Sequence, residues 1–281
     1  MTAETVNRPS VAALVWQQFR YQNKVFWRTP IAAFFTIVFP LMLLVLFTAI
    51  FGNDVIEGLG ITTAQFFTPG LAVFAAVSAT YTNLAIGTAI ARDNGILKRI
   101  RGTPIPPWAY IAGRVASGVY LAFIAMALMM AVGVVFYGVQ IIPRTIPAAL
   151  LTFVVGVSCF AALGMLVAAI SPNGDAAPAI TNATLLPVAF ISNIFFPIED
   201  PPRWMEIAGS FFPLKAFAEA FRDAFDPTLS GAQFHWPQIG YLVLWGVVAG
   251  ILAIRFFRWE PSAGSRSRRR RRKDEDGLEA A

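Results

Sequence analysis

Residues 115–137 read VASGVYLAFIAMALMMAVGVVFY, and residues 147–170 read PAALLTFVVGVSCFAALGMLVAAI. Neither stretch contains a charged residue, and each exceeds the roughly 20 apolar residues that a helix needs to cross a bilayer core. Because the bilayer core offers no water to the backbone, such stretches predict membrane-spanning α-helices. The fold class is therefore expected to be an all-α integral membrane protein.

The whole chain is also rich in apolar residues and poor in charged ones. Of its 281 residues, 57% are hydrophobic and 14% are charged, and the mean hydropathy is +0.62. Soluble domains carry roughly 25% charged residues, so a soluble globular enzyme is excluded. Six transmembrane helices are predicted, at about 31–51, 66–90, 115–137, 147–170, 176–197 and 237–257.

The basic residues predict the orientation of these spans, because short loops rich in Lys and Arg stay in the cytoplasm. With both termini inside, 18 of the 22 Lys and Arg residues fall on the cytoplasmic side. The remaining four are Arg144, Arg203, Lys215 and Arg222. We therefore predict a multi-pass protein of the cell membrane with both termini in the cytoplasm.

Segments outside the spans carry their own patterns. Residues 10–28 have helical periodicity with Arg20, Lys24 and Arg28 on one face, which predicts an amphipathic helix lying on the inner membrane surface. Residues 261–281 contain six consecutive cations followed by acidic residues, which predicts a disordered cytoplasmic tail that contacts anionic lipid rather than nucleic acid. The transmembrane domain is then expected to cover residues 1–260.

The sequence lacks the residues that ion-coupled carriers, metal sites and nucleotide-binding proteins need. None of the spans has an Asp, Glu, Lys, Arg or His in its central portion, which disfavours a proton- or ion-coupled secondary carrier. The single Cys159 and the single His235 offer neither a disulfide nor a metal site. No lysine follows a glycine, so the phosphate-binding loop of a nucleotide motor is absent, and uphill transport would need energy from another polypeptide.

The cytoplasmic segment between the second and third spans, residues 91–114, reads ARDNGILKRIRGTPIPPWAYIAGR. Cations surround Ile96, Leu97 and Ile100, and the prolines that follow end any helix. A short amphipathic helix of this kind suits docking, with apolar residues in a partner's groove and charges fixing the register. A loop that only sets the membrane orientation fits the residues equally well.

Three segments carry a resemblance to a known family. RDNGILKRIRGTPIPPWAYIAGR resembles the cytoplasmic loop of ABC type-2 permeases, in which an acidic residue and Gly precede Leu, Lys, Arg and a Thr-Pro pair. LLPVAFISNIFFPIEDPPRWMEIAGSFFPLKAFAEAFRDAF, residues 185–225, is similar to the family's fifth span and outer segment. FPLMLLVLFTAIFG, residues 39–52, resembles its first span. The resemblance is strongest to daunorubicin-resistance-type multidrug exporter permeases of actinobacteria.

This resemblance implies a permease subunit that pairs with a second permease and with separate ATP-binding subunits. ATP and Mg would then be bound by the partner subunit, while this chain carries no cofactor and no catalytic residue. The 91–114 loop would hold the helix that contacts the ATP-binding subunit. The implied contact residues are Arg92, Asp93, Gly95, Leu97, Lys98 and Arg101. Many relatives have Glu before the acidic residue and Gly, whereas this sequence has Arg92, Asp93 and Asn94, so individual ion pairs are not transferred.

The predicted cargo is a lipophilic or amphipathic compound, a drug or a lipid, moved outward. Aromatic residues and neutral polar residues of the first and fifth spans are the candidate cargo route, although phenylalanines that simply face lipid fit the same pattern. The candidates are Phe34, Phe35, Phe39, Asn182, Phe190, Asn193 and Phe195.

The outer segment predicts two short re-entrant helices. Leu214, Phe217, Phe221 and their apolar neighbours fall on one helical face, with Lys215, Glu219, Arg222 and Asp223 opposite. Asp200 and the prolines after it begin the preceding helix. An integral-membrane enzyme remains an alternative function, and its only candidate acids are Glu199, Asp200, Glu206 and Asp223.

Overall fold

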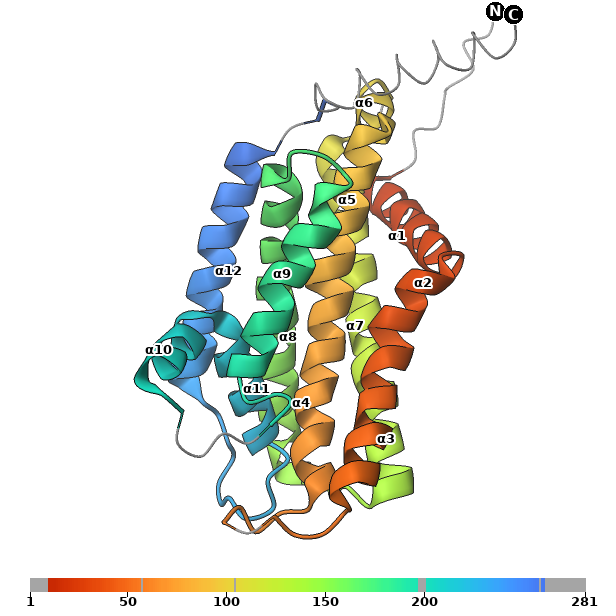
Figure 1. Cartoon of the computed structure of the whole chain (residues 1–281). Coiled ribbons are helices and arrows are strands. Elements are labelled where there is room, and N and C mark those ends of the chain that lie inside the picture. Colours follow the sequence, from red (N-terminus) through yellow and green to blue (C-terminus); the bar gives the residue numbers. More distant parts are fainter. Residues whose placement is uncertain (1–9, 57, 104, 197–200, 258, 261–281) are drawn as a thin grey trace, which may run out of the picture.

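The computed structural model describes residues 10–56, 58–103, 105–196, 201–257 and 259–260, and regular structure within these ranges is helical (Figure 1). One isolated β-bridge, between Val55 and Thr62, is the exception there. The predicted tail at 261–281 and the helix start at Asp200 lie outside the described residues.

Five helical segments of the described chain are long and apolar enough to cross a membrane. This confirms an all-α integral membrane protein. The segments are Pro30–Phe51 (α2, Pro30–Ala33; η1, Phe34–Val38; α3, Phe39–Phe51), Thr63–Asp93 (α4, Thr63–Val77; η2, Ser78–Thr82; α5, Asn83–Asp93), α7 (Pro107–Tyr137), Pro143–Ile170 (η3, Pro143–Thr145; α8, Ile146–Ile170) and α12 (Trp236–Phe256).

The predicted fifth span is shorter than expected. Helix α9 covers Ala176–Ile191, which is 16 residues, or about 24 Å at 1.5 Å per residue. The chain then turns through Ser192–Phe196, and Asn193 has a φ of 55°. A left-handed residue cannot continue a right-handed helix, so the predicted end at residue 197 is wrong.

The third predicted span begins earlier than expected. Helix α7 starts at Pro107, not at residue 115, and runs for 31 residues. Proline suits the first turn of a helix because its missing N–H has no intrahelical acceptor there. The extra two turns at the α7 start bury Ala109 and Tyr110 against other helices, which is the physical reason for the longer element.

Residues 10–28, predicted to form an interfacial helix, contain helix α1 (Val11–Trp27), and Ser10 caps it by accepting a hydrogen bond from the Ala13 N–H at 3.3 Å. Helix α1 packs closely on α7, because a Cβ at Gly113 would lie 2.5 Å from Gln18 Cβ. Figure 1 places α1, α6 (Ile96–Arg101) and the carboxyl end of α12 at one end of the bundle.

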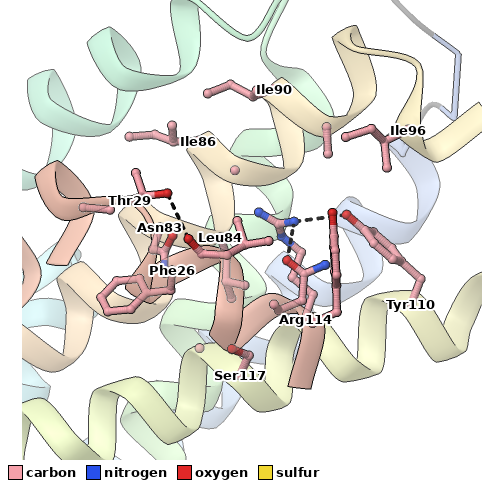
Figure 2. Close-up of a pocket in the computed structure, with 17 residues that line it drawn as sticks. Phe26, Thr29, Asn83, Leu84, Ile86, Ile90, Ile96, Tyr110, Arg114 and Ser117 are labelled. Atoms are coloured by element: carbon pink, nitrogen blue, oxygen red, sulfur yellow. Dashed lines mark hydrogen bonds between the residues drawn. The ribbon is translucent and has the colours of Figure 1, made fainter. Parts of the chain in front are cut away.

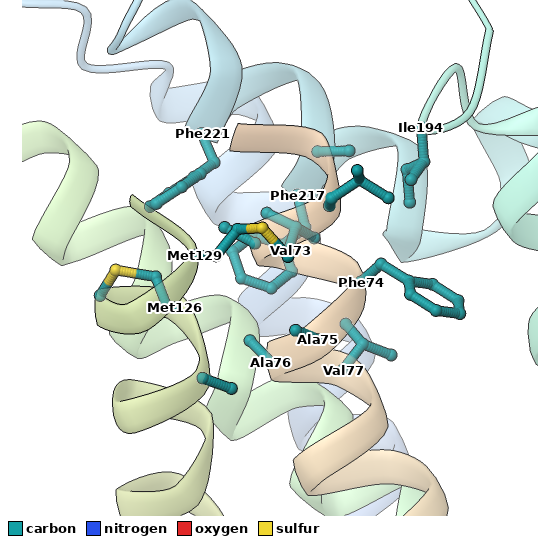
Figure 3. Packing of buried hydrophobic residues seen from close by; sticks show 14 of the residues in the cluster. Val73, Phe74, Ala75, Ala76, Val77, Met126, Met129, Ile194, Phe217 and Phe221 are labelled. Atoms are coloured by element: carbon teal, nitrogen blue, oxygen red, sulfur yellow. The ribbon is translucent and has the colours of Figure 1, made fainter. Parts of the chain in front are cut away.

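The segment predicted to form two outer helices contains α10 (Arg203–Phe211) and α11 (Pro213–Asp223). Helix α11 contributes Phe217 and Phe221 to the protein core, and Figure 3 shows them beside Val73 of α4 and Met129 of α7. Every residue of α4 is buried. The second predicted span is thus the centre of the molecule, and the other elements pack around it.

Candidate functional site

The loop between the second and third spans is built around one glycine. Gly95 has a φ of 72°, in the left-handed region that glycine adopts without steric cost, and it separates α5 from α6. The Arg99 N–H donates to the Gly95 carbonyl at 3.1 Å, so α6 starts directly after the turn. The sequence therefore forms a separate short helix at the end of the span.

One face of α6 is fixed to the rest of the chain. Leu97 is 0% exposed and packs in a small cluster with Ala91 of α5 and Tyr110 of α7. Phe257 and Trp259, which follow α12, pack against the same cluster. Leu97 therefore packs within its own chain. From the sequence, its side chain was instead expected to contact a partner protein.

The other face of α6 is basic and exposed. Lys98, Arg99 and Arg101 are exposed, and within the described ranges none of them forms an ion pair. Of the six predicted contact residues, Lys98 and Arg101 lie on this surface, which we call the basic face of α6. Gly95 shapes the turn that presents it.

Arg92 and Asp93 connect the end of α5 to the α8–α9 connection. The Arg92 guanidinium is 4% exposed and donates to the carbonyls of Ala168 at 2.9 Å and Ser171 at 2.6 Å. Asp93 accepts a hydrogen bond from the Gly174 N–H at 2.6 Å. These carbonyls lie at the C-terminus of α8, where they have no intrahelical donors and the helix dipole is negative. Arg92 thus contacts this chain rather than an open surface.

The predicted cargo residues fall into two groups. Phe34, Phe35 and Phe39 contact one another in sequence along the first span, and Phe34 and Phe35 are exposed. Phe190 and Phe195 contact each other at the carboxyl end of α9, with tilted rings whose centroids are 4.8 Å apart. Among the described residues no ring contact joins the two groups.

The two asparagines of the predicted route have different surroundings. Asn182 is exposed on α9. Asn193 is in the turn after α9, and its backbone carbonyl accepts a short hydrogen bond from Arg222 Nη2. Its structural contribution comes from its left-handed backbone and its carbonyl.

Arg222 was expected on the polar face of α11, and that expectation is wrong. Its guanidinium lies 4.0 Å from the centroid of the Phe66 ring and packs beside Gly70 of α4. Burial lowers the pKa of Arg222 to about 10, so the group stays charged at neutral pH. A carboxylate oxygen of the nearby Asp223 lies 3.2 Å from His235 Nε2, and burial raises the pKa of Asp223.

A third buried arginine, Arg114 of α7, was expected only to be a basic loop residue. It lies instead in a cavity between α1, α5 and α7, where it donates to Gln22 and Tyr110 (Figure 2). A signal for both positions existed in the sequence, because Arg114 and Arg222 each sit beside small and aromatic residues at helical spacing. Periodicity alone does not show which neighbour the charge meets.

An all-α bundle with helices long and apolar enough to cross a membrane defines the class of multi-pass membrane proteins. Residues 10–225 match the family described as ABC-2 type transporter. The chain belongs to this family, as its sequence predicted, and it is an ABC transporter permease.

Three relatives illustrate the similarity. The chain is 29% identical over 237 residues to the daunorubicin resistance ABC transporter permease protein DrrB1 of Streptomyces coeruleorubidus, covering 80% of this chain and 77% of that protein. It is 25% identical over 195 residues to the inner membrane transport permease YadH of Escherichia coli K12, covering 68% and 75%. It is 29% identical over 202 residues to the putative transport permease ycf38 of Cyanophora paradoxa, covering 69% and 68%.

Proposed function

We propose that this chain is the permease subunit of an ABC exporter that moves a lipophilic or amphipathic compound out of the cell with ATP hydrolysed by a separate subunit. The chain would cross the cell membrane six times, with α9 as the fifth span and both termini in the cytoplasm. The main support for the proposal is the arrangement of helix α6. Leu97 fixes this helix to its own chain, and its basic face is exposed.

The contacts of α6 support transmission of force from that face. A partner pushing on the basic face would move Leu97 and the cluster around it, which includes Tyr110 of α7. Through Gly95 the displacement would reach α5 and the Arg92 contacts with α8. Helix α5 continues into α4 through the π-helical turn η2, a type of element that often marks a functional hinge. The permease would thereby switch between two global states.

The first span supports pairing with a second permease, identical or related. Its surface carries a row of exposed apolar side chains, and the share of the segment buried inside the chain is low. The row comprises Phe34, Phe35, Val38, Met42, Val45, Leu46, Ile50 and Phe51. A cargo route between two such surfaces would include the predicted Phe34, Phe35 and Phe39, and its apolar character suits a lipophilic cargo.

The test of the proposal targets charges that the fold does not need. In the double variant Lys98→Glu, Arg101→Glu, we expect co-purification with the ATP-binding subunit and transport-coupled ATP hydrolysis to fall at least about tenfold, since close charge pairs across interfaces contribute about 1.5 kcal/mol or more. Leu97 is unsuitable for this test because its substitution would disrupt the chain's own packing.

Arg203→Glu, an exposed cation on α10 at a distance from α6, serves as the control and should assemble normally. Normal assembly of the double variant would contradict the docking role. Transport by the purified chain in liposomes with only an ion gradient would instead identify a stand-alone secondary carrier.

A further inference from the structure

A cavity of about 280 Å³ lies between α1, α5 and α7, at the same end of the bundle as α6 (Figure 2). This volume is near the lower end of the range for small-molecule pockets, roughly 300–1,000 Å³. Seventeen residues line it, and none of them is acidic. The wall is mostly apolar, so its few polar groups determine what it can hold.

Arg114 is the only charged residue of this lining, and its side chain is directed into the cavity. The residue is 9% exposed. Its Nη1 donates to Gln22 Oε1 at 3.1 Å and to the Tyr110 hydroxyl at 3.0 Å, and both acceptors are neutral. Its Nε is buried without a hydrogen-bond partner, and no ion pair to Arg114 occurs in the described part of the chain. The positive charge is therefore buried without a counter-charge.

The surroundings of Arg114 leave room and further polar groups for a ligand. A Cβ at Gly87 would lie 1.9 Å from Nη2, so the glycine is what allows the guanidinium to occupy this position. Asn83 and Ser117 also line the cavity, and within the described residues neither side chain has a hydrogen-bond partner. Three polar side chains with free donors thus share one cavity.

The cavity opens at the surface of α1. Tyr21, Val25 and Ile90 line it and are 52%, 42% and 43% exposed, respectively. Trp16 and Trp27 on the same helix are also exposed, and exposed tryptophans of an amphipathic helix are typical of the lipid headgroup zone. A ligand that enters here comes from the membrane surface, with an acyl chain remaining along the apolar sides of the spans.

We propose that this cavity binds the phosphate group of an anionic lipid from the leaflet on which α1 lies. A guanidinium matches phosphate geometry with parallel N–H donors, and hydrogen bonds between charged groups are about twice as strong as neutral ones. The lipid phosphate supplies the counter-charge that Arg114 lacks, and Asn83 and Ser117 donate to its remaining oxygens. This lipid site is independent of the cargo and of the ATP-binding subunit.

The test measures lipid binding to the full chain, purified in a neutral detergent and titrated with phosphatidylglycerol under native mass spectrometry. We expect one tightly bound phosphatidylglycerol per chain, and an affinity at least about tenfold lower in Arg114→Gln, which is the loss of one charge-assisted hydrogen bond. Arg203→Gln, an exposed cation on α10 outside the cavity, is the control and should change the affinity less than about twofold.

A second variant keeps the test decisive if Arg114→Gln does not fold. Asn83→Leu removes a side chain that holds nothing in the chain, so the melting temperature should be retained while the affinity falls by about threefold or more. Equal affinities in wild type and in the folded cavity variants would overturn the proposal. Saturable binding of inorganic phosphate to Arg114 without retained lipid would overturn the lipid assignment and point to a soluble phosphate compound.

Discussion

The two ends of the central span are held by buried arginines in different ways. At the α6 end, Arg92 donates to backbone carbonyls that terminate α8. At the opposite end, which the sequence predicts to be the outer end, Arg222 comes from α11, lies over the Phe66 ring of α4 and donates to the carbonyl of Asn193. The α6 end therefore depends on several directional charge-assisted hydrogen bonds, and the outer end on one such bond and a cation–π contact.

This difference indicates at which end of the central span the neighbouring helices can move more easily. Charge-assisted hydrogen bonds require defined donor and acceptor positions, whereas an arginine over a ring tolerates sliding across the ring face. The outer helices can shift on the central span with a smaller loss of interaction than the α5–α8 connection. In the proposed transport cycle, the α6 end would move as one rigid unit and the outer end would adjust.

The largest expected effect is at Arg92. In Arg92→Met we expect the free energy of unfolding to fall by about 3 kcal/mol, because the buried carbonyls of Ala168 and Ser171 lose their charged donor. Thermal unfolding in detergent measures this loss. The exposed Arg99→Met is the control and should change stability by less than about 0.5 kcal/mol.

A smaller loss is expected at Arg222. The Arg222→Met variant keeps apolar volume over Phe66 and α4 while it removes the cation–π contact and the bond to Asn193, which together amount to about 2 kcal/mol. The same unfolding measurement applies, with the exposed Arg203→Met as its control. A loss in Arg222→Met equal to or larger than that in Arg92→Met would break the comparison between the two ends.

The smallest effect concerns pH and only the outer end. Burial raises the pKa of Glu219, more than Lys215 lowers it, so the folded state holds this proton more tightly than the unfolded chain. The resulting stability is full below the unfolded pKa of about 4.3 and is lost as pH rises through the folded value.

Wild type is therefore expected to lose melting temperature relative to Glu219→Gln between about pH 4 and pH 7. Melting curves of both proteins in detergent across this range provide the measurement. A difference that stays constant with pH would show that Glu219 is solvated like a surface carboxylate, and the outer segment would then lack this electrostatic cost.

Much of the fold was predictable from residue patterns. Apolar length predicted the spans, periodicity predicted α1 and α11, and proline positions indicated where α10 and α11 begin. The boundaries at α7 and α9 were not predictable, because they depend on packing around Tyr110 and on the left-handed backbone of Asn193. For the site, the motif order identified α6, but it did not show that Leu97 is buried and Lys98 exposed.

The amino-acid sequence alone determined that this protein is a helical membrane protein and that it belongs among ABC-2 permeases. The lengths of apolar stretches and the order of motifs are local properties of the chain, so both can be read without the tertiary structure. Only the tertiary structure decided where the arginines lie. A charge count treats Arg92, Arg114 and Arg222 alike, but each meets a different environment, namely helix-end carbonyls, a mostly apolar cavity and an aromatic ring. Those environments are assembled from residues distant in sequence, and a charge count contains no information about them.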